Sequence, residues 1–145
     1  MAQFTSETTE KGVTERRFAL DRPGDAVPGV LWTPEAADGT DDGDRGRPLV
    51  VIGHGGSQHK RAPNVLALAR CLVRHHGFAA LAIDAPFHGE RMPPSERELP
   101  FDEQRRALRR RLFGGDQEGI AARAVADTTA ALDFARSLPE VGTGP

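Results

Sequence analysis

The chain has 145 residues and a mass of 15.6 kDa, with 19 Lys plus Arg against 21 Asp plus Glu. This length suits one domain with its own core. The formal net charge of -2 and the pI near 6.2 exclude the strongly basic surface of a nucleic-acid-binding protein and a polybasic membrane-binding patch. Because Cys71 is the only cysteine, an internal disulfide and a cysteine-rich zinc site are also excluded.

The hydrophobic segments are too short for a membrane-spanning helix. The longest apolar run covers residues 78–83, far below the roughly 18 residues that a membrane crossing needs. Residues 1–12 are polar and lack the apolar core of a signal peptide. We therefore expect a cytoplasmic protein without a membrane partner.

The first predicted elements form an antiparallel hairpin at the edge of a larger sheet. Residues 14–20 and 28–33 favour strands, and Asp-Arg-Pro-Gly-Asp at 21–25 favours a turn between them. Because proline cannot donate to a strand ladder, Pro28 and Pro34 are expected to bracket the second strand. Residues 35–47 are polar and glycine-rich, which predicts a flexible surface loop.

Residues 49–83 have the pattern of a strand, a helix and a second, parallel strand. Residues 49–52 are a continuous apolar run, which predicts a parallel strand covered on both faces. A helix is expected from Pro63 to the C-terminal glycine Gly77, and residues 78–83 form the next strand. The crossover should be right-handed. The expected apolar face of the helix consists of Val65, Leu68, Ala69, Leu72 and Val73.

The second half of the chain is expected to be mostly helical. A charged excursion at 91–100 precedes a short helix at 102–113, a Gly114-Gly115 break and a long helix capped by Asp116 and ended before Pro139. Its inner face should hold Ile120, Ala124, Thr128, Ala131, Leu132 and Ala135. The arginine-rich stretch 105–111 is interpreted as a solvated helix face, and the same segment could border a substrate cleft.

Two turns carry the most specific signal in the sequence. Gly-His-Gly-Gly-Ser at 53–57 follows the first parallel strand, and Asp-Ala-Pro-Phe-His-Gly at 84–89 follows the next. This pair resembles the α/β-hydrolase family, closest to dienelactone-hydrolase-like esterases, with Phe87 in place of a glycine common in the second turn. The resemblance implies a three-layer α/β fold in which residues 1–145 are a single, incomplete domain, the N-terminal half. It runs from the hairpin to the helix that begins at Asp116.

The resemblance also implies the roles of the residues in these turns. The backbone amides of Gly56 and Ser57 would form the oxyanion hole, and a side chain at Gly55 or Gly56 would obstruct the approach of a substrate oxygen. The alternative is a tight turn that needs glycine only for a positive φ. The turns themselves would be built by the structural residues His54, Gly55, Asp84, His88 and Gly89.

No cofactor or metal is expected. His54, Asp84 and His88 would emerge at the same end of the sheet, but no ligand-spacing signature supports a metal site. His75 and His76 close a helix, where a cation complements the helix dipole. His59 has no partner that the sequence identifies.

The sequence lacks the remaining parts of a serine hydrolase. Hydrolases of this fold carry the nucleophile on a G-x-S-x-G turn, and none of the four serines, Ser6, Ser57, Ser95 and Ser137, lies in one. A catalytic histidine in its usual place is also missing. The complete parent would act on a small-molecule ester, whereas the 145 residues alone are expected to be inactive.

Two other functions are compatible with parts of the pattern. Gly53-x-Gly55 and Asp84 could belong to a nucleotide-binding module, although Gln58 occupies the third glycine position and the helix starts late, at Pro63. A non-catalytic interaction domain would bind a partner chain along the strand at 49–52. The exposed edge of that strand also predicts self-association or complementation by another segment.

Overall fold

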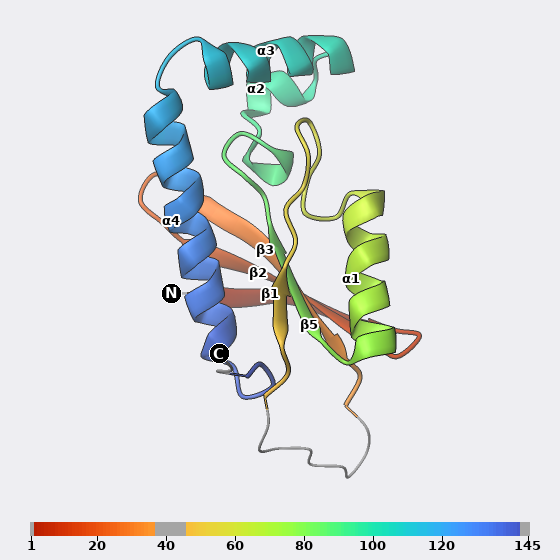
Figure 1. The fold of residues 1–145 in the computed structure, drawn as a ribbon. Coiled ribbons are helices and arrows are strands. Elements are labelled where there is room, and N and C mark those ends of the chain that lie inside the picture. Colours follow the sequence, from red (N-terminus) through yellow and green to blue (C-terminus); the bar gives the residue numbers. More distant parts are fainter. Residues whose placement is uncertain (1, 37–45, 143–145) are drawn as a thin grey trace.

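The computed structural model describes residues 2–36 and 46–142, which form a five-stranded sheet with helices (Figure 1). The strand order is β1-β2-β3-β5-β4. Among the strand pairs of these described residues, β4–β5 is parallel and the others are antiparallel. The strands are β1 (Ala2–Glu10), β2 (Val13–Asp21), β3 (Ala26–Pro34), β4 (Leu49–Val51) and β5 (Ala79–Ile83). Most of the predicted loop at 35–47 lies outside the described residues.

The expected hairpin is present as β2 and β3, but it is not at the edge of the sheet. β1 pairs with β2 and takes that position. Its residues are exposed except for the half-buried Ala2, so no alternation of apolar and polar residues predicts it. The turn between β1 and β2 has positive φ at Lys11 and Gly12, the geometry of a two-residue hairpin loop. That Lys-Gly pair is the signal that could have identified β1.

The prediction that Pro28 would bracket its strand is wrong, since β3 continues beyond it to Ala26. Pro28 pairs with Ala19 of β2, and its carbonyl accepts the Asp84 N–H at 3.0 Å. N–H and C=O of one residue point to the same side of a strand, so the missing proline donor faces the side on which β5 has just ended. Proline therefore costs no bond of the ladder there.

The predicted strand, helix and parallel strand are confirmed as β4, α1 (Pro63–His76) and β5. Gly77 ends the helix at φ 67°, as a left-handed C-terminal glycine. The expectation that residues 49–52 are covered on both faces is wrong, because Val51 is 42% exposed and β4 is an edge strand. A single parallel bridge joins Arg47 to Val141, just before β4 begins.

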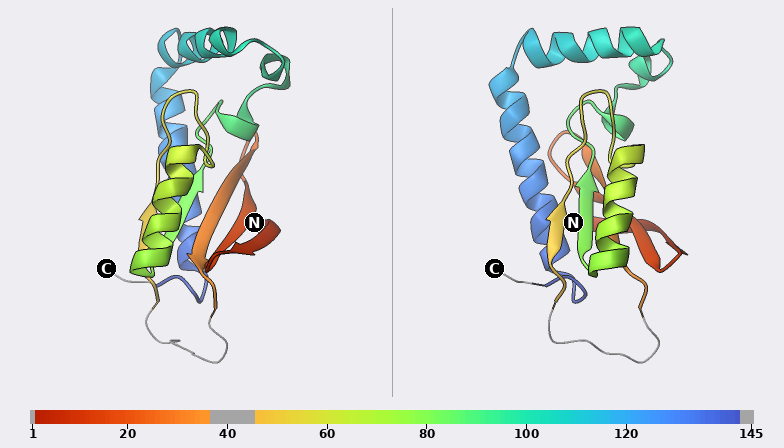
Figure 2. Two further views of the ribbon diagram at one scale, coloured as in Figure 1. Left: turned by 90° about the vertical axis from the view of Figure 1, so that its right-hand side faces the viewer. Right: turned by 45° about the vertical axis from the view of Figure 1, so that its right-hand side comes forward.

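Helices lie on both faces of the sheet, which confirms the three-layer α/β architecture (Figures 1 and 2). On one face Val65, Ala69 and Val73 of α1 pack with residues of β3 and β5. On the other face α4 (Gln117–Arg136) packs through Ala131 and Ala135. The inclusion of Leu68 in the apolar face of α1 is wrong, because it is 48% exposed on the outer side of the helix.

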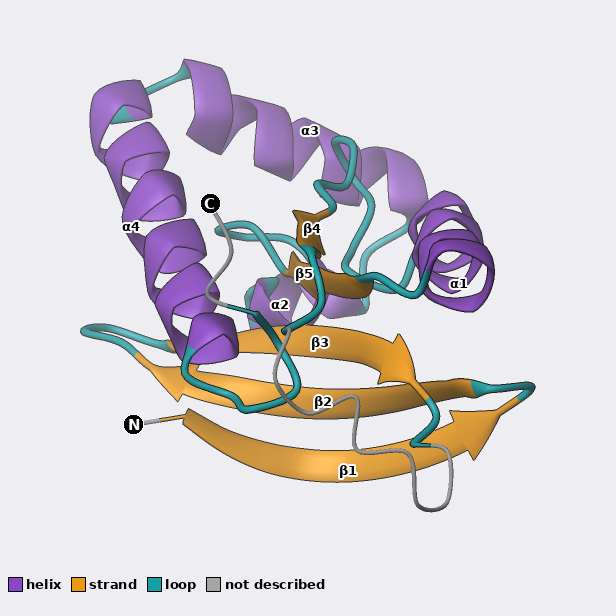
Figure 3. Cartoon of the chain, turned by 60° about the horizontal axis from the view of Figure 1, so that its bottom comes forward, coloured by secondary structure: helices purple, strands orange, loops and turns teal. Residues whose placement is uncertain are grey.

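The remaining helices lie beyond the ends of β4 and β5 (Figures 2 and 3). They are the 3-10 helix η1 (Gly89–Arg91), the one-turn α2 (Pro94–Arg97) and α3 (Phe101–Phe113). The predicted cap of α4 is confirmed, since the Asp116 carboxylate accepts the Gly119 N–H at 2.8 Å. None of the helices in residues 2–36 and 46–142 combines the length and apolarity that a membrane crossing requires.

Candidate functional site

The two turns singled out in the sequence meet at a small cavity. The carboxyl ends of adjacent parallel strands lie at one edge of a sheet, so the segments after β4 and β5 come together there. The cavity has a volume of about 150 Å³. Its walls include Ser57, Gln58, His59, Phe87, His88 and Gly89 from the two turns, and α3 closes it with Phe101, Gln104 and Leu108. α3 therefore borders this cavity with apolar and amide side chains rather than with its arginines, and the preceding helix α2 adds Glu96.

The backbone conformation of the first turn does not require glycine at its glycine positions. Gly53, Gly55 and Gly56 all have φ outside the left-handed region, whereas Ser57 adopts φ 62°. The alternative that the glycines serve a positive φ is therefore wrong. A Cβ at Gly53 or Gly56 would meet no atom within 4 Å, and one at Gly55 would meet only the flexible Gln58 side chain. The open space lies over the backbone of the turn.

The amides of the turn differ in their partners. The Gly55 N–H donates to the Gln58 side-chain oxygen at 2.9 Å, and the Gln58 N–H donates to the Gly55 carbonyl at 3.1 Å. Within the described parts of the chain, no hydrogen bond uses the N–H of Gly56 or Ser57. Of these two residues Ser57 lines the cavity and Gly56 lies next to it in the turn. The turn thus holds two adjacent amides available for an acceptor.

His54 and His88 connect the two turns. His54 Nε2 accepts the Ala85 N–H at 3.1 Å, and the His54 and His88 rings lie 5.0 Å apart. His88 is buried and its Nδ1 lies 2.9 Å from the Pro86 carbonyl, to which it donates. Burial lowers the pKa of His88, against the opposing effect of that hydrogen bond. A neutral imidazole packed between the turns follows from this environment.

Asp84 is a fully buried carboxylate that clamps the turns together. It accepts the Lys60 backbone N–H at 2.9 Å, the Lys60 ammonium at 2.8 Å and the Glu90 N–H at 3.0 Å. Gly89 has φ 54°, and a Cβ there would lie 2.5 Å from the Asp84 carboxylate. Only glycine fits this close approach. These contacts place Asp84 and Gly89 against each other within the second turn.

Lys60 is a residue of the site that the sequence did not reveal. Its side chain is 6% exposed and contacts both Asp84 and Glu90. Lysine is rarely buried unless it is paired, and the partners lie far along the chain. A lysine shortly after the glycine turn was the available signal.

A second cluster of ion pairs is centred on the buried Arg91 and contacts Asp84. The Arg91 side chain is 1% exposed and donates to the Asp84 carbonyl at 3.0 Å and to the Asp25 carboxylate. Its guanidinium also lies 2.9 Å from Asp127 on α4, and Arg22 reaches the other oxygen of that carboxylate at 3.2 Å. Asp127 lies in the middle of the face of α4 that we expected to be apolar. These contacts join the second turn to α4 and to the β2–β3 turn.

The donor set around Asp84 does not suit a metal. Among the described residues, no group of three or more His, Cys, Asp or Glu side chains is placed to hold an ion. His54 accepts a backbone N–H, and Asp84 is neutralised by Lys60. His59 accepts the Arg61 N–H at 3.2 Å, so the structure supplies the partner that the sequence did not identify.

The chain matches no protein-family model and no curated protein. Among solved structures it is similar to a PEG-bound cold-adapted esterase from an Arctic intertidal metagenomic library, with 34% identity and a TM-score of 0.66. That match covers 95% of this chain and 51% of the esterase. The native structure of such an esterase matches at 26% identity and a TM-score of 0.57, over 95% and 49% of the two chains.

An acetyl xylan esterase from Paenibacillus sp. R4 shares the fold at 22% identity and a TM-score of 0.55, over 97% of this chain and 42% of that one. The chain spans about half the length of these esterases. The strand order and the helices on both faces of the sheet agree with the fold of these solved structures. The chain has an α/β-hydrolase-like fold that corresponds to the N-terminal portion of known esterase structures.

Proposed function

We propose that this chain is the part of a carboxylic-ester hydrolase that supplies the oxyanion hole. The esterase neighbours support a hydrolase at the level of the fold. The amides of Gly56 and Ser57, beside the cavity between the two turns, support the location of the hole. The nucleophile and the catalytic histidine would come from sequence outside the 145 residues, since no serine here lies in G-x-S-x-G.

The chemistry required of this part is electrostatic. When a serine oxygen attacks an ester carbonyl, negative charge develops on the carbonyl oxygen, and fixed N–H donors stabilise it without rearrangement. Removing one such donor typically raises the barrier by about 3 kcal/mol. The Lys60–Asp84 contacts hold the glycine turn against the second turn, so the donors are positioned before substrate binds. Without a nucleophile, the chain alone should not turn over an ester.

One observation carries the proposal. Gly56 needs no positive φ and its Cβ direction is open, so neither the backbone nor the packing of this chain requires a glycine there. A ligand that approaches the backbone closely would require one.

The test joins residues 1–142 to the part of the cold-adapted esterase that lies beyond the aligned region. The fusion should hydrolyse p-nitrophenyl acetate, and the 145-residue chain should not exceed the buffer rate. Gly56→Val should lower kcat roughly 10²- to 10³-fold, the loss typical of a disabled oxyanion hole, with little change in Tm. Gly53→Val, the same change at another open position, is the matched control and should keep most of the activity. A folded fusion without activity, or a fully active Gly56→Val fusion, would contradict the proposal.

A further inference from the structure

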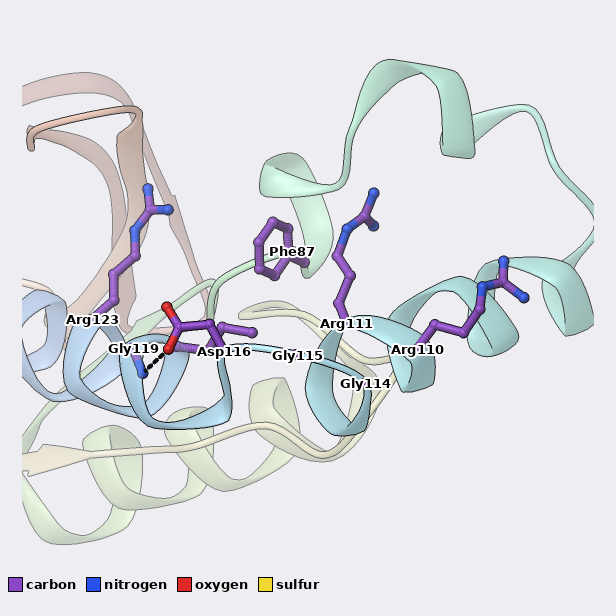
Figure 4. A pocket seen from close by; sticks show the side chains of 9 residues that line it. Phe87, Arg110, Arg111, Gly114, Gly115, Asp116, Gly119 and Arg123 are labelled. Atoms are coloured by element: carbon purple, nitrogen blue, oxygen red, sulfur yellow. Dashed lines mark hydrogen bonds between the residues drawn. The ribbon is translucent and has the colours of Figure 1, made fainter.

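Phe87 lies between the cavity at Ser57 and a second, larger cleft. This cleft has a volume of about 500 Å³ and runs between the end of α3 and the start of α4. Figure 4 shows it with Arg111 of α3 on one side of the Phe87 ring and Asp116, at the start of α4, on the other. Among the described residues, Phe87 is the one that lines both the cavity and the cleft. Its side chain is therefore the wall that the two spaces share.

The backbone of Phe87 is strained. It adopts φ 66°, a conformation that glycine occupies without strain and that is unfavourable for an aromatic residue. Residues in such conformations cluster at functional sites, where the surrounding structure holds them in place. Because the backbone geometry favours glycine here, the reason for an aromatic ring must lie in what the ring contacts and encloses.

An ion pair crosses the same wall and holds the ring. Arg111 lines the cleft and Glu96 lines the cavity, and the Arg111 guanidinium donates to the Glu96 carboxylate at 2.6 Å. The same guanidinium lies 5.0 Å from the centre of the Phe87 ring, within the range of a cation–π contact. The ring is thus fixed between two spaces that would otherwise be continuous.

The size and closure of the cavity favour one part of an ester. Its volume of about 150 Å³ lies below the roughly 300 Å³ at which sites for whole small molecules begin, whereas the cleft lies within their range. When a serine nucleophile hydrolyses an ester, the alcohol leaves first and the acyl group stays on the enzyme until water releases it. Because α3 closes the cavity beside the oxyanion donors, this space suits the acyl group, and the alcohol needs a more open route.

We propose that Phe87 determines the length of the acyl chain that the esterase accepts. Its ring ends the cavity at Ser57, restricts the acyl group to a short chain and keeps longer chains out of the larger cleft. The identity of the ligand as an acyl group rests on the proposed function. The barrier between the two spaces does not.

The first experiment uses the fusion enzyme and compares kcat/KM for p-nitrophenyl hexanoate with kcat/KM for p-nitrophenyl acetate. In Phe87→Ala the ratio of hexanoate to acetate should rise about tenfold or more, because the additional methylene groups gain space. Phe113→Ala is the matched control, since it removes an exposed ring that lines neither space. The ratio of hexyl acetate to ethyl acetate, which varies the alcohol, should not change.

The second experiment uses the 145-residue chain and needs no turnover. NMR titrations with acetamide and hexanamide, two neutral carbonyl compounds, follow the backbone amide signals of Ser57 and His88. Acetamide should shift these signals in the parent chain and in Phe87→Ala, and hexanamide should shift them only in Phe87→Ala. Phe87→Gly also removes the ring and fits φ 66° without strain, so it should respond as Phe87→Ala does and replaces it if that variant fails to fold.

Several results would overturn the inference. In an active fusion they are an unchanged acyl ratio in Phe87→Ala, a change in the alcohol ratio instead, or an equal effect of Phe113→Ala, and each would leave the oxyanion proposal intact. In the 145-residue chain they are a response of the parent to hexanamide, or no response of any variant to either amide. An inactive fusion together with hexanamide binding only in the Phe87 variants would reject the oxyanion proposal and keep Phe87 as the barrier.

Discussion

Gly89 and Gly56 lie in neighbouring turns, yet their environments predict opposite responses to a methyl group. At Gly89 the left-handed φ and the carboxylate of Asp84 both reject a Cβ. Gly89→Ala should therefore lower the free energy of unfolding by more than about 1 kcal/mol. Gly56→Ala should change it by less than about 0.5 kcal/mol, or stabilise the chain, since that position is open. Urea denaturation measures both, and equal losses would contradict the described turns.

The buried Lys60–Asp84 pair should be expensive to break on one side only. Lys60→Met removes the ammonium and leaves a carboxylate that is 0% exposed, retaining only its two backbone N–H donors. We expect a loss of about 3–5 kcal/mol in the free energy of unfolding. Lys11→Met, at an exposed lysine of the β1–β2 turn, is the control. An unchanged urea midpoint in Lys60→Met would show that the Lys60–Asp84 ion pair does not form in solution.

The lowered pKa of His88 makes stability depend on pH. Because the pKa of the folded state lies below the ordinary value of 6.5, the unfolded chain binds more protons between these two values. The contribution is complete above pH 6.5 and is lost as the pH falls toward the folded pKa. Urea midpoints measured from about pH 7.5 to about pH 5.5 should fall on acidification. They should fall less in His88→Gln, while His75→Gln, at an exposed position of α1, should behave as the parent.

At the scale of single residues, the sequence predicted what short-range chemistry controls. Gly89 and the two turn histidines could be assigned to turns because they lie in the glycine-containing segments that follow the predicted strands. Lys60, Arg91 and Asp127 could not, since each is buried only because partners from distant segments neutralise it. No local pattern marks such a residue. In the helical periodicity of α4, Asp127 is simply a polar residue on a face that is otherwise apolar.

At the scale of the elements, α4 depends on one capping side chain. Asp116→Ala removes the acceptor of the Gly119 N–H and should cost about 1 kcal/mol. Asp133→Ala, an exposed acid near the other end of the helix, should cost nothing or stabilise slightly, since negative charge is unfavourable there. Thermal melts followed by circular dichroism compare the two. A loss of equal size in both variants would argue against the cap.

The elements with strong periodicity or clear ends were predicted well, and the exceptions have identifiable causes. α1, α3 and α4 were found from spacing, glycines and caps. β1 was missed because pairing with β2 maintains a strand whose side chains are almost all exposed. Leu68 and the two-sided burial of β4 were misassigned because burial depends on neighbours that lie outside the local sequence.

At the scale of the whole molecule, β4 is an edge strand with an exposed valine. Unpaired edges attract other strands, so the 145-residue chain should self-associate with rising concentration. Val51→Lys places a charge on that edge and should shift sedimentation velocity profiles toward the monomer. Leu68→Lys alters a similarly exposed apolar residue on α1 and should leave association unchanged. Monomers of the parent chain at all concentrations, or equal effects of both variants, would contradict this.

The centre of the molecule also provides an optical probe. Trp32 is the only tryptophan and there is no tyrosine, so ultraviolet emission excited at the red edge originates from one indole in β3. That indole is 0% exposed and donates to the Glu15 carboxylate at 2.9 Å. Its fluorescence therefore reports directly on whether the middle of the sheet is closed, without any added dye.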